Sequence, residues 1–191
     1  MNRWTSADEL FAYLESFTNL ERTGYNPREY RLERMAHLLT VFDSPHTGYD
    51  VIHVAGSKGK GSVSTFAAYC TAAAGHRVGL YTSPHVSNYR ERITVLSPEC
   101  RPLPLDDTLL ACGEDIAQHI DALRQTEPDD TLPTTFELLT LLAFLAFRSS
   151  GCTAAVLEVG LGGRLDATNL VRPKVSVITQ IELEHTDYLG P

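Results

Sequence analysis

The segment 56–62, with the sequence GSKGKGS, holds the residue types that bind phosphate groups. It follows the apolar run 50–55, which is typical of a buried strand, and precedes the alanine-rich run 63–74, which is typical of a helix. The N–H groups of a glycine loop, the end of a helix and a lysine together attract a phosphate. We therefore predict a nucleotide phosphate loop in which Lys60 supplies the positive charge.

This segment departs from the common phosphate loop G-x-x-x-x-G-K-[ST]. Only two residues separate Gly56 from Gly59, and Gly61 stands where that motif has the hydroxyl that binds Mg²⁺. A ligand for the metal must therefore come from another segment. Ser62 has two open interpretations, as a phosphate contact and as a cap of the helix.

Three further polar groups follow predicted strands. They are Ser83, Glu158 and His185. Carboxyl ends of parallel strands meet at one edge of a sheet, so we expect these side chains beside the phosphate loop. Magnesium prefers oxygen ligands, and we predict that Ser83 and Glu158 bind it; His185 is a less usual ligand on chemistry alone. The strands concerned are predicted at 77–82, 153–159 and 175–179.

Each of these residues also has an interpretation without a chemical role. By spacing alone Ser83 is a turn residue before Pro84, and Glu158 is equally well explained by a buried salt bridge. His53, inside an apolar strand, is predicted to be a core histidine with a hydrogen-bond partner. His85 and His185, taken singly, are typical loop histidines.

The surrounding elements must hold these groups in place. Helical periodicity predicts helices over 28–41, 105–124 and 136–149 and one that Ser6 caps, and a short strand is expected at 93–95. Apolar strands that alternate with helices predict an α/β fold, a parallel sheet covered on both faces.

Composition narrows the function classes. The 191 residues carry a net charge of −8, which argues against nucleic-acid binding, although local lysines and arginines still suit an anionic small ligand. The four cysteines form no C-x-x-C pair, so we expect reduced thiols and a cytoplasmic protein. The longest apolar run, 138–147, is too short to span a bilayer, so no membrane contact is expected.

Taken together, several segments resemble the consecutive signatures of folylpolyglutamate synthases, which with dihydrofolate synthases are part of the Mur ligase superfamily. The most specific is LEVGLGGRLDATN at 157–169. The others are 54–62, 79–85, 91–93, 135–140, 177–179 and 185–190. The resemblance covers essentially the whole chain.

The resemblance implies an ATP-dependent ligase. ATP phosphorylates the γ-carboxylate of a folate or tetrahydrofolate, and the amino group of L-glutamate attacks the acyl phosphate to form an amide. Synthesis of dihydrofolate from dihydropteroate is a possible second activity. Such a reaction needs charge neutralisation on the phosphate and exclusion of water. Family members are often monomeric.

Residue roles follow from the matched motifs. The resemblance implies that Ser83 and Glu158 hold one Mg²⁺ and His185 a second, and that Lys60, Glu158 and His185 act in catalysis. ATP is assigned to Gly56, Ser57, Lys58, Gly59, Lys60, Gly61 and Ser62. The pterin of the folate is assigned to Thr134, Phe136, Asp166 and Ala167.

Two departures from the family are visible. Ser57 and Lys58 stand where many relatives carry Thr-Asn, which adds a second lysine to the loop. Relatives also continue beyond the equivalent of Pro191, so we expect residues 1–191 to be the N-terminal part of the ATP-binding domain, without the C-terminal glutamate ligase domain and inactive alone. Alternatives are another P-loop kinase or hydrolase and a non-catalytic nucleotide-binding fragment.

Overall fold

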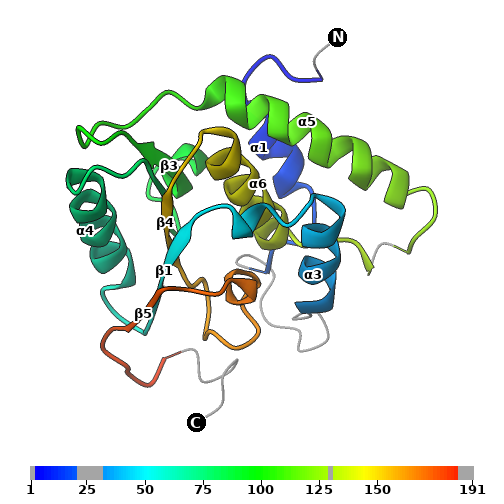
Figure 1. Cartoon of the computed structure of the whole chain (residues 1–191). Coiled ribbons are helices and arrows are strands. Elements are labelled where there is room, and N and C mark those ends of the chain that lie inside the picture. The colour runs from blue at the N-terminus through cyan, green and yellow to red at the C-terminus, as the bar shows by residue number, and fades with distance from the viewer. Residues whose placement is uncertain (1–2, 21–31, 129–130, 185–191) are drawn as a thin grey trace.

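A computed structural model describes residues 3–20, 32–128 and 131–184 of the chain (Figure 1). Its centre is a five-stranded sheet with the strand order β3-β2-β4-β1-β5. The strands are β1 (Asp50–Ala55), β2 (Val78–Tyr81), β3 (Ile93–Leu96), β4 (Ala154–Glu158) and β5 (Val175–Ile178). The α/β fold expected from the sequence is confirmed.

Helices cover both faces of this sheet. The α-helices are α1 (Ala7–Glu15), α3 (Leu32–Val41), α4 (Lys60–Ala73), α5 (Asp106–Leu123) and α6 (Thr135–Ser149). Short 3-10 helices are η1 (Pro45–Thr47), η2 (Tyr89–Arg92) and η4 (Ala167–Leu170). Part of the helix predicted at 28–41 lies outside the described residues, which begin again at Leu32.

The prediction of a wholly parallel sheet is wrong at one strand. Four strands run parallel, but β3 pairs with β2 in the antiparallel direction, with Tyr81 opposite Ile93 and Val78 opposite Leu96. The connection 82–92 holds only the short helix η2 and no α-helix. Parallel strands need a long crossover, whereas this short connection returns the chain along its neighbour in the opposite direction.

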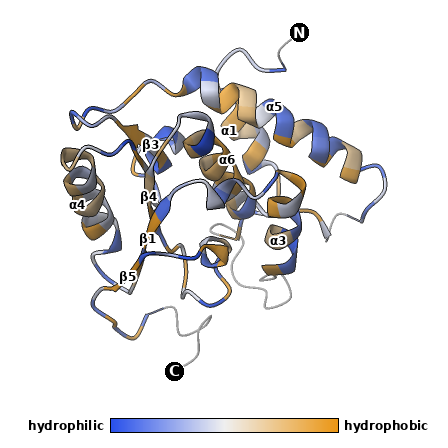
Figure 2. Ribbon diagram, in the orientation of Figure 1, coloured by the Kyte–Doolittle hydropathy of each residue, from blue (hydrophilic) through white to orange (hydrophobic). Residues whose placement is uncertain are grey.

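The hydrophobic core lies mainly between the sheet and α6. Helix α6 is buried along most of its length, and α1, α3 and α5 pack around it. Figure 2 shows α5 with both hydrophilic and hydrophobic residues, as expected for a helix half on the core. Gly79 on β2 admits the Phe147 ring, since a Cβ there would lie 2.4 Å from Phe147 Cγ. Helix α4 covers the opposite face of the sheet.

The carboxyl ends of the four parallel strands meet at one edge of the sheet. Glu158, the last residue of β4, lies beside Val54 near the end of β1, and Leu157 lies beside Tyr81 at the end of β2. The segments that leave these strands are therefore neighbours. In the described residues, no helix is sufficiently long and apolar to cross a membrane.

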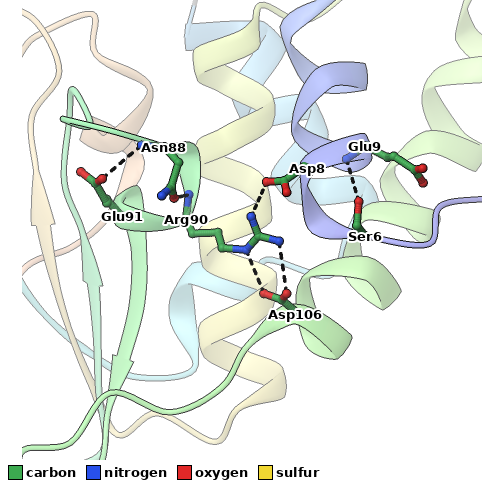
Figure 3. Close-up of polar contacts among 7 residues, drawn as sticks. All are labelled: Ser6, Asp8, Glu9, Asn88, Arg90, Glu91 and Asp106. Carbon is green, nitrogen blue, oxygen red and sulfur yellow. Dashed lines mark hydrogen bonds and ion pairs between the residues drawn. The ribbon is translucent and has the colours of Figure 1, made fainter.

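An ion-pair network fixes the segment that follows β2 (Figure 3). Arg90 of η2 bonds Asp106 at the start of α5, with 3.2 Å between Nε and Oδ1, and also pairs with Asp8 of α1. Ser6 caps α1 as predicted, because its Oγ accepts the N–H of Glu9 at 3.4 Å. The chain between β2 and β3 is thus tied to two helices.

Candidate functional site

The glycine loop has a backbone that only glycine adopts easily. Gly56 has φ of +135° and Gly59, the N-cap of α4, has φ of +79°. A Cβ at Gly56 would lie 2.0 Å from Thr179 Oγ1. The N–H of Ser57 donates to the carbonyl of Gln180 at 2.9 Å, so the loop is bound to the chain that follows β5.

The two lysines of the loop differ in placement. The Lys60 ammonium donates to the carbonyl of Gly56 at 2.8 Å and is part-buried over its own loop. The Lys58 ammonium pairs with Glu184 at 2.9 Å, and 60% of its side chain is exposed. The Lys60 ammonium therefore lies at the loop itself, while Lys58 reaches toward the segment after β5; the role of Lys60 toward phosphate stays a prediction.

Glu158 lies against the start of α4, beside Gly61, which takes the position where the common phosphate loop has a hydroxyl that binds Mg²⁺. A Cβ at Gly61 would lie 3.4 Å from Glu158 Oε2. The same oxygen accepts the backbone N–H of Ser83 at 3.0 Å. The structure therefore brings Gly61, Ser83 and Glu158 together, and the contact with Ser83 is made by its backbone. A Cβ at Gly61 would therefore be in van der Waals contact with the carboxylate.

Burial dominates the electrostatics of Glu158. The residue is 4% exposed, and this desolvation raises the pKa of its carboxyl, while the Ser83 N–H and the charges of Lys60 and Arg92 oppose the shift. A buried carboxylate beside a phosphate-binding loop fits a divalent cation that lies between carboxylate and phosphate.

The side chains at this site fit magnesium better than a metal ion whose ligands all come from the protein. Among residues 3–20, 32–128 and 131–184 no three His, Cys, Asp or Glu side chains cluster as a metal site would require. Magnesium usually takes one or two protein oxygens and completes its shell with phosphate and water. Glu158 and Ser83 are the residues that lie together here, with the backbone N–H of Ser83 on the carboxylate. His185 lies outside the described residues.

Arg92 is a component of this site that the sequence marked only as a local positive charge. It is 1% exposed, and its Nε donates to His85 Nδ1 at 2.9 Å. Because a guanidinium cannot accept, His85 Nδ1 is the acceptor and the ring proton lies on Nε2. Arg92 also lies over the ring of Tyr89, with 5.1 Å from Cζ to the centroid. In the sequence, Arg92 lies in the segment 91–93 that contributes to the resemblance, but no further role was assigned to it.

The loop that carries Ser83 is held by Glu91. Its carboxylate accepts three backbone N–H groups, and the contact with Asn88 is drawn in Figure 3. The donors are Val86 at 2.7 Å, Ser87 at 2.9 Å and Asn88 at 3.1 Å. These bonds lower the pKa of Glu91. The position of Ser83 is therefore fixed by its own loop.

Two of the four residues assigned to the pterin, Phe136 and Asp166, lie beside Gly160. A Cβ at Gly160 would lie 2.6 Å from Phe136 Cζ and 3.0 Å from Asp166 Oδ2, so two residues distant in the sequence approach the same glycine. Thr134 caps α6 in a capping box, and Ala167 begins η4. The structure thus brings together two segments about 30 residues apart, next to the carboxyl end of β4.

A buried ion pair supports this second region, and sequence reasoning missed it. Arg34 of α3 contacts Glu137 of α6 with 3.1 Å between Nε and Oε2. Glu137 also accepts the Thr134 N–H at 2.7 Å, which completes the capping box. Burial raises the pKa of Glu137, and Arg34 opposes the shift. The pair anchors the start of α6, where Thr134 and Phe136 lie.

The glycine loop, the buried carboxylate and the parallel sheet are typical of nucleotide-binding α/β domains. No family model matches the chain. It is 37% identical over 182 residues to a folylpolyglutamate synthase of Lacticaseibacillus casei, covering 95% of this chain and 40% of that protein. It is 41% identical over 173 residues to a probable bifunctional folylpolyglutamate synthase/dihydropteroate synthase of Halobacterium salinarum, covering 90% and 20%.

The fold agrees with these relatives. A solved complex of a folylpolyglutamate synthase with AMPPCP and folate superposes with a TM-score of 0.81 and 36% identity, covering 96% of this chain and 42% of that one. By sequence and by fold, the chain is similar to folylpolyglutamate synthases and to bifunctional dihydrofolate synthase/folylpolyglutamate synthases. It spans about a fifth to two fifths of the length of the curated relatives it matches.

Proposed function

We propose that this chain provides the phosphate-binding part of an ATP-dependent ligase. The ligase adds L-glutamate to the γ-carboxylate of folate or tetrahydrofolate through an acyl phosphate, and dihydrofolate synthesis is a second candidate activity. The names of the relatives and the solved complex with AMPPCP and folate support this proposal.

One observation carries the proposal. The Glu158 carboxylate, at the end of β4, lies against Gly61 at the start of α4 and accepts the N–H of Ser83 after β2. Three strand ends thus contribute to a single polar site around the glycine loop. A phosphate in that loop would meet the N-terminus of α4 and the Lys60 ammonium.

In this site Ser83 and Glu158 would hold Mg²⁺ between themselves and the phosphates, with His185 as ligand of a second ion. The metal would neutralise phosphate charge during transfer to the carboxylate. Lys60 orients and neutralises the phosphate chain, and Arg92 keeps positive charge beside Glu158. Ser57, Lys58, Gly59 and Ser62 complete the nucleotide loop.

The acceptor folate is placed on the side of the sheet where α6 and η4 meet. Phe136 offers an aromatic ring on which a pterin can stack, and Thr134, Asp166 and Ala167 are assigned to the same group from the starts of α6 and η4. This placement puts the acceptor near the end of β4, and therefore near the phosphate site.

We place residues 1–191 in the N-terminal part of the ATP-binding domain, with the glutamate ligase domain beyond them, because the relatives are more than twice as long. All four cysteines are free, which suits a reducing cytoplasm. We also expect a monomer that binds neither nucleic acid nor membranes.

Calorimetric titration with Mg-ATP tests the loop. Lys60→Ala should weaken binding at least tenfold, since it removes the ammonium nearest the phosphates. Lys174→Ala is the matched control, because that lysine is exposed and pairs only loosely, at 3.7 Å, with Asp50. Equal affinity of the Lys60→Ala variant and the unaltered protein would refute the assignment.

ADP release separates the ligase from a kinase or hydrolase. In the protein that contains this chain, release in the presence of folate should require L-glutamate. Release at the same rate without glutamate would favour a hydrolase, and transfer to a hydroxyl acceptor would favour a kinase. A folded protein that does not bind Mg-ATP would favour a non-catalytic fragment.

A further inference from the structure

A buried chain of hydrogen bonds links β1 to the glycine-rich loop after β4. His53 Nε2 lies 2.8 Å from Thr168 Oγ1, and Thr168 Oγ1 donates to Asp166 Oδ1 at 2.5 Å. The hydroxyl has a single proton, which is directed at the carboxylate. His53 Nε2–H must therefore be the donor to the hydroxyl oxygen, and this fixes the tautomer of the ring.

The Asp166 carboxylate is saturated by its own surroundings. Oδ2 accepts the N–H groups of Gly160 and Leu161, both at 3.0 Å. Oδ1 accepts the Thr168 N–H at 2.9 Å in addition to the Thr168 hydroxyl. A carboxylate offers about four acceptor positions, and these four bonds fill them. Asp166 therefore fixes the backbone of the loop that contains Gly160 and Leu161.

The chain lies directly beneath the region assigned to the acceptor folate. Asp166 is 4% exposed and Thr168 is fully buried, so both need internal partners. Gly160, whose N–H the carboxylate holds, is the residue against which Phe136 packs. Any shift of the carboxylate would therefore move the backbone that faces the Phe136 ring.

We propose that His53 is a positioning residue for the folate acceptor. Through Thr168 it orients the Asp166 carboxylate, which in turn holds Gly160 and Leu161 in the shape that receives the acceptor beside Phe136. This inference rests on the proposed function. His53 is assigned to neither the nucleotide nor the acceptor, and the simpler view of it as a core histidine with a partner predicts no selective effect on the acceptor.

Two variants break the chain without changing shape greatly. Thr168→Val removes the hydroxyl, and His53→Leu removes the donor. Both should raise the KM for folate about tenfold while the affinity for Mg-ATP stays unchanged and kcat stays within twofold. His53→Gln should restore the folate KM, because its amide can donate to Thr168.

The control is a second histidine–threonine pair. His76 Nδ1 lies 3.0 Å from Thr153 Oγ1 at the opposite, amino-terminal edge of the sheet. Thr153→Val removes the same kind of bond and should leave the folate KM unchanged. Amide hydrogen exchange at Gly160 and Leu161 provides a readout that needs no substrate, and it should quicken in Thr168→Val and His53→Leu.

The outcomes separate this inference from the proposed function. A wild-type protein that turns over folate, with variants of unchanged folate KM, would overturn the role of His53 alone. Absence of folate-dependent turnover in the unaltered protein that contains this chain would overturn the proposed function. In that case the amide exchange of Gly160 and Leu161 still tests the role of His53. Unchanged exchange in both variants would show that His53 does not position this loop, and faster exchange would support that role.

Discussion

A comparison of Gly56 with Gly59 separates two costs of a side chain in the phosphate loop, the backbone strain of a positive φ and the steric overlap of the added Cβ. Both have positive φ, but a Cβ at Gly56 would lie 2.0 Å from Thr179 Oγ1, whereas none of the described atoms lies within 4 Å of one at Gly59. An alanine with positive φ costs about 1–2 kcal/mol. Overpacking adds about 1–3 kcal/mol. We therefore expect Gly59→Ala to cost about 1–2 kcal/mol and Gly56→Ala about 2–5 kcal/mol.

Urea unfolding of the two variants measures these costs. The double variant Gly56→Ala/Thr179→Ala should recover part of the difference, because it removes the hydroxyl at 2.0 Å but leaves the Thr179 backbone N at 3.1 Å. Equal free energies of unfolding for Gly56→Ala and Gly59→Ala would refute the close approach between the loop and the segment after β5. A double variant without recovery would show that backbone strain alone is responsible.

Three further predictions concern the elements around the site. Burial raises the pKa of Glu137 above its ordinary value of 4.5, so ionisation of this carboxyl lowers the free energy of unfolding as the pH rises from 4.5 through the raised pKa. Arg34→Met should therefore cost about 3–5 kcal/mol at pH 7 and less at pH 5. The double variant Arg34→Met/Glu137→Gln should recover most of this cost in urea unfolding. An equal cost at both pH values would contradict this pairing. Arg90→Ala should cost about 1 kcal/mol or less and lose that effect in 1 M salt, because its partners are largely exposed; a loss of several kcal/mol would show the network of Figure 3 to be far stronger than its exposure suggests. Gly160→Ala should raise the folate KM with little change in Mg-ATP affinity, because its Cβ would lie 2.6 Å from Phe136 Cζ; an unchanged KM would place the acceptor elsewhere.

The strands could be predicted closely from the sequence because they are short apolar runs that end in glycine or polar residues. Their parallel order also places Ser83 and Glu158 at one edge, and the structure brings the two together. The direction of β3 was missed because the prediction of a parallel sheet did not take into account that the connection 82–92 is too short for a parallel crossover. Glu91 holds the connection through N–H groups of its own loop, and Arg90 ties it to Asp106 of α5.

The polar interior was the least predictable part. Arg92, Glu137 and Asp166 are ordinary surface residue types, and only the tertiary fold places each beside its partners. Asp166 illustrates the difference. The resemblance assigns it to the pterin, while the structure shows that its carboxylate accepts hydrogen bonds from N–H and O–H groups of its own loop. Its assigned contact with the pterin stays a prediction. The part of the site assigned to His185 lies outside the described residues.

A crystal structure with Mg²⁺ and AMPPCP tests the central claim most directly. The account predicts phosphates within hydrogen-bond distance of the N–H groups of loop 56–62, with the ion about 2.0–2.1 Å from an oxygen of Glu158. The Lys60 ammonium should leave the Gly56 carbonyl, to which it now donates at 2.8 Å, and contact the phosphates. A nucleotide bound elsewhere, or an ion that avoids Glu158, would contradict the account.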